Sequence, residues 1–65
     1  MKLNIRTNRK KRNLSIVNLE KLTGISKSSL SRFEREEQYP SILELEWIAI
    51  ALDVRITDLF DSIVK

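Results

Sequence analysis

The fold of this chain is decided by GISKSSLSRFE, residues 24–34. Gly24 tolerates a positive φ and therefore suits a tight turn. Ser26 then offers a hydroxyl oxygen that accepts a hydrogen bond from an N–H of a first helical turn. Leu30, Phe33 and Glu34 follow at spacings of three and four residues, the periodicity of one helix face. The stretch predicts a turn and a helix over about 27–35, with these three side chains facing inward.

The opposite face of this predicted helix is polar and basic. Its side chains are Lys27, Ser28, Ser31, Arg32 and Arg35. A helix face that only meets solvent more often alternates acidic with basic residues. The composition of this face is therefore a mild indication of a binding surface.

Upstream of the turn, the sequence predicts two further helices. The first, over about 3–12, is expected to end at Asn13, because asparagine tolerates the left-handed conformation at a helix end. Ser15 is predicted to cap the second, over about 16–22. Leu19 and Leu22 are expected to form the inner face of that second helix.

Downstream, Ser41 and Glu44 are spaced as a capping box that opens a fourth helix running to about Leu52. A turn over about 53–57 leads into a last helix over about 58–64. The chain has one glycine and one proline, too few for an architecture of many tight β-turns. We therefore predict a compact, all-α single domain of five helices over residues 1–65.

Composition excludes several classes of chemistry. The 65 residues include no cysteine and no histidine, which removes disulfides, thiol and imidazole nucleophiles and the usual zinc ligand sets. The longest apolar run, residues 47–52, is far shorter than the roughly 20 residues that span a bilayer, and the basic N-terminus lacks the apolar stretch of a signal peptide. We predict a cytoplasmic protein without catalytic activity, metal, cofactor or membrane partner.

The net charge of +3 is unevenly distributed along the chain. Residues 1–32 hold nine of the 12 basic side chains and one of the nine acidic ones, Glu20. Such a split indicates a face built for a polyanion, and a solvated basic helix with no partner explains it equally well.

Between residues 14 and 60, several signals occur at fixed spacings. Leu-Ser (14–15) is separated from the turn glycine by eight residues, and YPS (39–41) opens the next helix. AIALDV (49–54) then precedes DLF (58–60). The combination resembles the five-helix domains of the phage repressor and Cro type, also called the xenobiotic-response-element family, with a helix-turn-helix at about 16–35. The resemblance covers nearly the whole chain and implies sequence-specific binding of double-stranded DNA in transcriptional control.

By position, the resemblance assigns base reading to Lys27, Ser28 and Arg32, because the second helix of such a motif lies in the major groove. A guanidinium such as that of Arg32 suits the O6 and N7 atoms of guanine. The resemblance also implies contacts with phosphate groups. These fall on Ser15, Ile16, Ser26, Ser31, Arg35, Gln38 and Tyr39.

The family also carries a partly buried ion pair that falls on Arg9 and Glu34 here, which implies a structural role for both. An unpaired carboxylate on an inward face is costly, so a partner for Glu34 is expected on physical grounds as well. The chain departs from the family at three positions. Ile16 stands where glutamine is usual, Glu20 where a small residue is usual, and Glu36 where glycine often ends the helix.

A second apolar stripe on the predicted fourth helix indicates an interface. The inward stripe of this helix consists of Leu45, Ile48, Ala49 and Leu52. Leu43, Trp47 and Ile50 lie on a different face, and Ile56 and Ile63 extend this second set. Exposed apolar stripes mark interaction surfaces. A homodimer contact is the preferred interpretation, because it places two recognition helices about 34–36 Å apart on a palindrome. A regulatory protein partner, or coverage by the last helix, also explains the stripe.

The predicted function is that of a small phage-type or plasmid-type transcriptional regulator, either a repressor or an activator. The alternative is a protein-interaction module, such as the antitoxin of a toxin–antitoxin pair, that uses the stripe of Leu43, Trp47 and Ile50. A membrane-surface element is disfavoured because the basic N-terminal helix lacks a broad apolar face with aromatic residues. RNA binding by stacking is disfavoured because Tyr39 alone among the aromatic residues is expected to be free.

Overall fold

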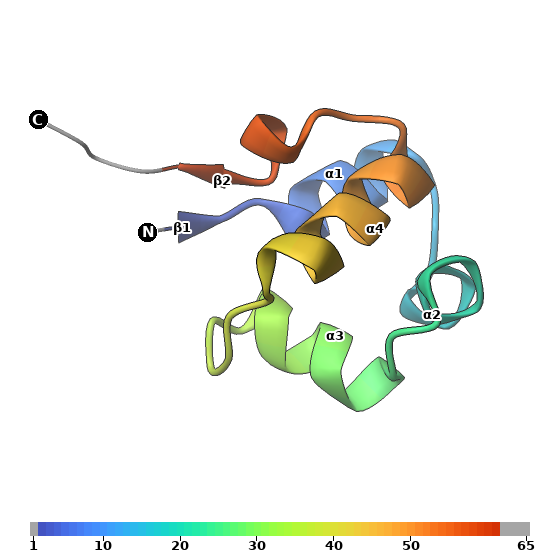
Figure 1. The fold of residues 1–65 in the computed structure, drawn as a ribbon. Helices are drawn as coiled ribbons and strands as arrows, with labels where there is room; N and C mark the ends of the chain where they lie inside the picture. Colours follow the sequence, from blue (N-terminus) through green and yellow to red (C-terminus); the bar gives the residue numbers. More distant parts are fainter. Residues whose placement is uncertain (1, 62–65) are drawn as a thin grey trace, which may run out of the picture.

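Four short helices form most of the computed structural model, which describes residues 2–61 (Figure 1). The elements in chain order are β1 (Lys2–Leu3), α1 (Ile5–Lys11), α2 (Ile16–Thr23), α3 (Lys27–Glu34), α4 (Ile42–Leu52), a 3-10 turn (Ile56–Asp58) and β2 (Phe60–Asp61). The predicted all-α class is confirmed, and α2 and α3 form the predicted helix-turn-helix.

The core lies between the inner faces of the four helices. α2 packs against α3 and α4, and α1 packs against the same two helices. Leu30 and Phe33 are fully buried, as their spacing predicts. Helices of 7 to 11 residues are too short to be stable alone, so this shared core holds them. Its buried side chains are Leu3, Ile5, Leu19, Ile25, Leu30, Phe33, Leu45, Ile48, Ala49, Leu52 and Leu59.

The predicted serine caps are present at the starts of α2, α3 and α4. The hydroxyl oxygens of Ser15, Ser26 and Ser41 each accept a hydrogen bond from the backbone N–H three residues later, at 3.1–3.2 Å. At α4, Glu44 completes the capping box, because its Oε1 accepts the N–H of Ser41 at 2.9 Å. These bonds satisfy N–H groups that have no partner inside the helix. The three helix starts are therefore predicted correctly from the sequence.

α3 ends without a glycine. The backbone N–H of Glu36 donates to the carbonyl of Phe33 at 3.1 Å, and that of Glu37 donates to the carbonyl of Arg32 at 2.9 Å. This pair of bonds closes a helix end when the residue after the last turn is left-handed, and Glu36 has φ 59°. The same backbone conformation follows α1 and α4, at Asn13 and Asp53.

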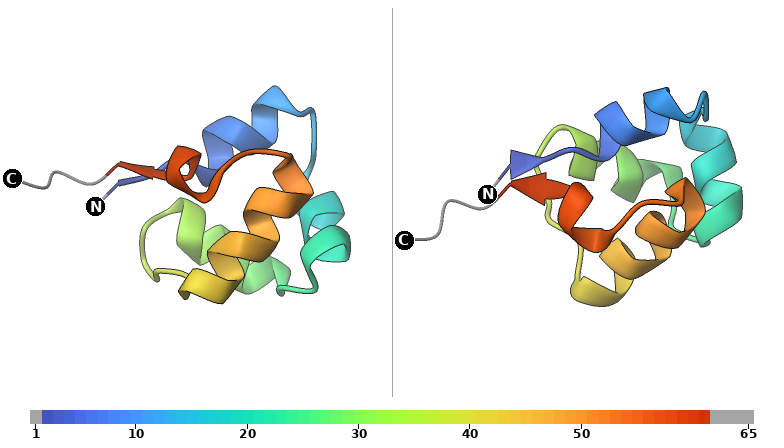
Figure 2. Two further views of the ribbon diagram at one scale, coloured as in Figure 1. Left: turned by 45° about the horizontal axis from the view of Figure 1, so that its top comes forward. Right: turned by 90° about the horizontal axis from the view of Figure 1, so that it is seen from above.

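The predicted last helix is wrong over the described residues. Residues 56–58 form a single 3-10 turn, and Phe60–Asp61 then runs as β2. β2 pairs antiparallel with β1, with Leu3 opposite Phe60, and the two strands lie side by side at one end of the molecule (Figure 2). The described residues therefore contain four α-helices instead of five. Residues 62–64 of the predicted helix lie outside the part of the chain that the structure describes.

The same strand pairing shortens the first helix, which begins at Ile5 instead of about residue 3. The N–H of Leu3 donates to Oε1 of Glu36 at 2.8 Å, and the N–H of Asn4 donates to the carbonyl of Leu59 at 2.7 Å. These partners are distant in sequence, so local periodicity contains no sign of them.

Leu22 does not join the core, which corrects the predicted inner face of α2. Leu19 is fully buried, whereas Leu22 is 59% exposed. Thr23, which follows Leu19 by four residues, is half-buried in its place. The core-facing side of α2 thus passes through Leu19 and Thr23, and Leu22 lies at its edge.

Candidate nucleic-acid interface

α3 presents its predicted polar face to solvent. Lys27, Ser28 and Arg32, the three predicted base-reading residues, are all exposed. Leu30 and Phe33 anchor the opposite side of the helix in the core. Packing of these two side chains therefore determines which face of α3 is accessible.

A recess of about 300 Å³ lies beside this face, where α1, the start of α2 and α3 meet. It brings together three of the predicted phosphate-contacting residues, Ile16, Ser31 and Arg35. It also includes Arg6, which the sequence analysis did not single out. The signal was available, because Arg6 precedes Arg9 by three residues and so lies on the same side of α1.

The predicted pair of Arg9 and Glu34 lines the floor of this region as a two-point ion pair. Nε of Arg9 lies 2.7 Å from Oε2 of Glu34, and Nη2 lies 3.1 Å from Oε1. The two side chains are only 12% and 7% exposed. Nη1 of Arg9 also donates to the carbonyl of Leu14 at 2.8 Å. The hydrogen bonds to Glu34 raise the pKa of Arg9 more than burial lowers it, so the pair joins α1 to α3 as a charged unit.

Arg35, a predicted phosphate contact, has a carboxylate partner within the chain. Its Nε lies 3.0 Å from Oε2 of Glu37, and its Nη2 lies 3.2 Å from Oε1. These hydrogen bonds raise the pKa of Arg35 and lower the pKa of Glu37. Both side chains are more than half exposed. The pair is therefore well solvated, and a phosphate group can compete for the guanidinium.

The remaining predicted phosphate contacts are all exposed. The hydroxyl groups of Ser15 and Ser26 already take part in the caps of α2 and α3. Gln38 and Tyr39 lie in the loop that joins α3 to α4, and Tyr39 is 51% exposed. The loop thus adds accessible polar groups beyond the C-terminal end of α3.

Glu20 is half-buried on α2 and reaches the start of α3. Its Oε2 accepts a hydrogen bond from the backbone N–H of Lys27, the first residue of α3, at 2.9 Å. A carboxylate at this position departs from the usual small residue of the family, and the sequence alone does not indicate its role. The partner is a backbone group, which no side-chain pattern reveals.

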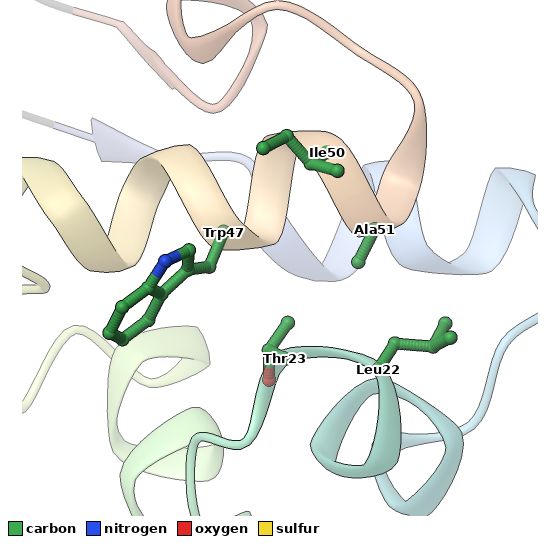
Figure 3. A pocket seen from close by; sticks show the side chains of 5 residues that line it. All are labelled: Leu22, Thr23, Trp47, Ile50 and Ala51. Atoms are coloured by element: carbon green, nitrogen blue, oxygen red, sulfur yellow. The ribbon is translucent and has the colours of Figure 1, made fainter.

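An apolar patch lies away from the polar face of α3 and consists of Leu22, Leu43, Trp47 and Ile50. These residues are 42–71% exposed, so residues 2–61 leave a large part of each one uncovered. Leu22, Trp47 and Ile50 also line a pocket of about 330 Å³ between the end of α2 and α4 (Figure 3). Figure 3 shows Trp47 and Leu22 on either side of Thr23. The predicted stripe on α4 is thus accessible, and Leu22 of α2 extends the same apolar surface.

Two residues predicted to extend this stripe do not contribute to the patch as described. Ile56 is half-buried and packs against the core from the 3-10 turn, because the chain turns back toward β1 at that point. Ile63 lies outside the described residues.

Residues 2–61 contain no group of three or more acidic, cysteine or histidine side chains placed to hold a metal ion. None of the helices in this range has the length and apolar character needed to cross a membrane.

Comparison with known proteins identifies a family. The sequence model of a helix-turn-helix family matches residues 5–59, which include all four helices. No curated protein sequence matches the chain.

Solved structures of SinR are similar to the chain. One is a crystal structure of SinR, a master regulator for biofilm formation, in complex with DNA, with 39% identity, a TM-score of 0.83 and coverage of 89% of this chain and 94% of that one. A second is the N-terminal DNA-binding domain of SinR from Bacillus subtilis, with 38% identity, a TM-score of 0.82 and coverage of 91% and 87%. A third, a complex of SinR with SinI, matches at 39% identity and a TM-score of 0.83 over 89% of this chain and 57% of the other.

Proposed function

The chain belongs to the helix-turn-helix family, and we infer that it is a DNA-binding transcriptional regulator. The observation that carries this function is the exposed face of α3, with Lys27, Ser28 and Arg32 accessible directly after the turn. The relatives solved as a DNA complex and as a DNA-binding domain support it. The proposed activity is binding without catalysis, in the cytoplasm.

In the proposed complex, α3 lies in the major groove of double-stranded DNA. Arg32 donates to O6 and N7 of a guanine, the commonest specific contact of an arginine. Lys27 and Ser28, one turn earlier, contact neighbouring base edges. The three residues thus read a short run of base pairs.

Phosphate groups are bound beside α3, in the recess at the start of α2. Arg6 and Arg35 supply positive charge there, and the first N–H groups of α2 suit an anion because the helix dipole points toward it. Ile16 lacks the hydrogen-bonding groups of the usual glutamine. The two arginines therefore carry the side-chain part of this contact.

We propose that the apolar patch holds a second copy of the chain. A single α3 reads only one half-site, and a symmetric dimer reads a palindrome. A specific interface buries roughly 800 Å² on each partner around an apolar centre, and four large exposed side chains supply such a centre. Lys21 and Glu46, exposed on the same two helices, carry opposite charges that a two-fold contact can pair. The complex of SinR with SinI supports a protein partner as the second candidate for this patch.

The function is tested by selecting bound sequences from random duplex DNA and then measuring the affinity for the best site at several salt concentrations. We expect a palindrome and an affinity that falls steeply with salt, by a log–log slope of about −0.9 for each phosphate contact.

A variant and a matched control locate the contact surface. Arg32→Ala is expected to lose about 1–3 kcal/mol of discrimination at one base pair of each half-site. Arg55→Ala removes the same charge from an exposed side chain after α4 and should leave base preference unchanged. Recovery of no preferred sequence by the folded chain would contradict the proposed function.

A further inference from the structure

Glu20 lies at the junction of the two helices that carry the proposed DNA contacts. It is the single acidic residue among the first 32, in a region whose other charges suit a polyanion. The family usually has a small residue at this position. A carboxylate here lowers the electrostatic attraction for DNA. Its presence therefore points to a role other than direct contact with DNA.

The hydrogen bonds at the start of α3 show what Glu20 does. Two acceptors hold the first turn of this helix. Ser26 accepts the N–H of Ser29 at 3.2 Å, and Glu20 accepts the N–H of Lys27 at 2.9 Å. The dipole of α3 favours a negative charge at this end, which strengthens the second bond.

The two acceptors constrain different parts of the structure around the start of α3. Ser26 belongs to the turn that leads directly into α3, so its bond shapes that turn and moves with the helix. Glu20 belongs to α2, so its bond ties the start of α3 to another helix. The connection between them is short and contains Gly24 in the left-handed region, with φ 76°. A glycine restricts the backbone least of all residues, so the connection alone constrains the angle of α3 weakly.

We propose that Glu20 is a positioning residue that sets how α3 is oriented on α2, and thereby how Lys27 and Ser28 meet the bases. This role rests on the proposed DNA-binding function. Hydrogen bonds to base edges depend on tenths of an ångström in donor–acceptor distance. Loss of the Glu20 bond therefore lowers base preference more than it lowers binding to phosphate groups.

Three variants separate position from charge. Glu20→Ala removes the acceptor and introduces a small residue that the fold accommodates. Glu20→Gln keeps an acceptor oxygen and removes the negative charge. Asp61→Ala, at an exposed position on β2, removes a negative charge without touching α3. Thermal unfolding of each variant identifies the temperature range in which all are folded.

The first measurement uses no DNA. Amide hydrogen exchange, followed by NMR on the intact chain, is expected to be slow at the Lys27 N–H in the wild-type chain and in Glu20→Gln, and several-fold faster in Glu20→Ala. The N–H of Ser29, bound to Ser26, should change little. Equal exchange at Lys27 in all three chains would overturn the proposed contact.

The second measurement compares affinities for the selected site, for sites with one altered base pair and for random duplex DNA. Glu20→Ala is expected to lose about tenfold of its preference at the base pairs read by Lys27 and Ser28, while its affinity for random DNA stays equal or rises. Glu20→Gln and Asp61→Ala should keep the wild-type preference. If Glu20→Ala keeps the wild-type base preference, the positioning role of Glu20 is overturned and the proposed function is not. If the wild-type chain selects no sequence, the proposed function itself is overturned.

Discussion

α3 and α4 have similar inner faces and opposite outer ones. Leu30 and Phe33 of α3 and Ile48 and Leu52 of α4 are all fully buried in one core. On the outer side, α3 exposes lysine, serine and arginine, whereas α4 exposes Leu43, Trp47 and Ile50 in addition to its acidic residues. Burial in the shared core explains the apolar composition of the inner faces. The composition of the outer faces does not contribute to that core and requires a different explanation.

This difference separates the two halves of the proposed function. A polar, basic face binds a polyanion through charge and hydrogen bonds, whereas an apolar face associates with another protein through its buried area. The two surfaces share one scaffold, so damage to the scaffold removes both activities. Damage to the polar face of α3 removes DNA binding alone, whereas damage to the apolar patch removes association between copies and thereby lowers the affinity for a palindrome.

The largest effect is expected from breaking the shared scaffold with Glu34→Ala. This variant leaves the guanidinium of Arg9, which is mostly buried, without its carboxylate, and removal of one partner of such a pair costs roughly 3 kcal/mol or more. Urea unfolding followed by circular dichroism measures the loss. A decrease below about 1 kcal/mol would show that the pair behaves as a solvated one and that α1 and α3 are held by apolar packing.

Trp47→Glu is expected to disrupt association through the apolar patch. A buried tryptophan at the centre of an interface is worth about 2 kcal/mol or more, and a carboxylate there adds repulsion between two copies. Sedimentation should show a shift from dimer to monomer, with a lower affinity for the palindrome, while circular dichroism shows that the monomer keeps its helices. A wild-type chain that is already a monomer would sink the second-copy proposal and favour a different protein partner.

Glu37→Gln tests the contribution of Arg35 to the polar, DNA-binding face of α3. It releases Arg35 from the carboxylate that holds it, so the guanidinium is available to phosphate without competition. We expect an increase of about two- to fivefold in affinity at low salt, in line with the small strength of exposed ion pairs, and a salt dependence steeper by up to about one phosphate contact. Asp61→Asn, with the same charge change on β2, provides the control. An equal increase in both variants would mean that net charge alone is responsible.

The smallest effect concerns the ends of the two helices. Asp53 follows α4 with φ 55°, and its carboxylate, 93% exposed, lies 3.9 Å from Nη2 of Arg12. Such an exposed ion pair contributes little, so Asp53→Gly chiefly removes backbone strain and should raise the free energy of unfolding by about 0.5 kcal/mol. Glu36 follows α3 with φ 59°, but its carboxylate accepts the N–H of Leu3. Glu36→Gly should therefore give no gain, and chemical unfolding of the two variants side by side decides between these outcomes.

Local signals account for most of the fold. The starts of α2, α3 and α4 follow from three serines, because a cap is formed by residues only three apart. The burial of Leu30 and Phe33 follows from helical spacing in the same way. The exposure of Lys27, Ser28 and Arg32 is the other side of that pattern, so the accessible face of α3 was predictable as well.

Long-range contacts account for what was missed. The last segment has apolar residues that suit a helix, yet Phe60–Asp61 pairs with Lys2–Leu3 at the other end of the chain. Leu22 has the right spacing for an inner face, and the placement of α4 over the Leu19 and Thr23 side of α2 leaves it exposed. In both cases a neighbour distant in sequence determines the outcome.

The sequence by itself therefore determined the starts of α2, α3 and α4 and the face that α3 exposes, because each depends on residues within a few positions of one another. The family followed from the joint spacing of such local signals over residues 14–60. Only the tertiary structure decided the partners of single polar groups. It directs Glu20 of α2 to the backbone of Lys27 in α3, and Glu36 to the first strand. A hydrogen bond requires two atoms within about 3 Å of each other, and for groups on different elements that proximity exists only after the helices have packed.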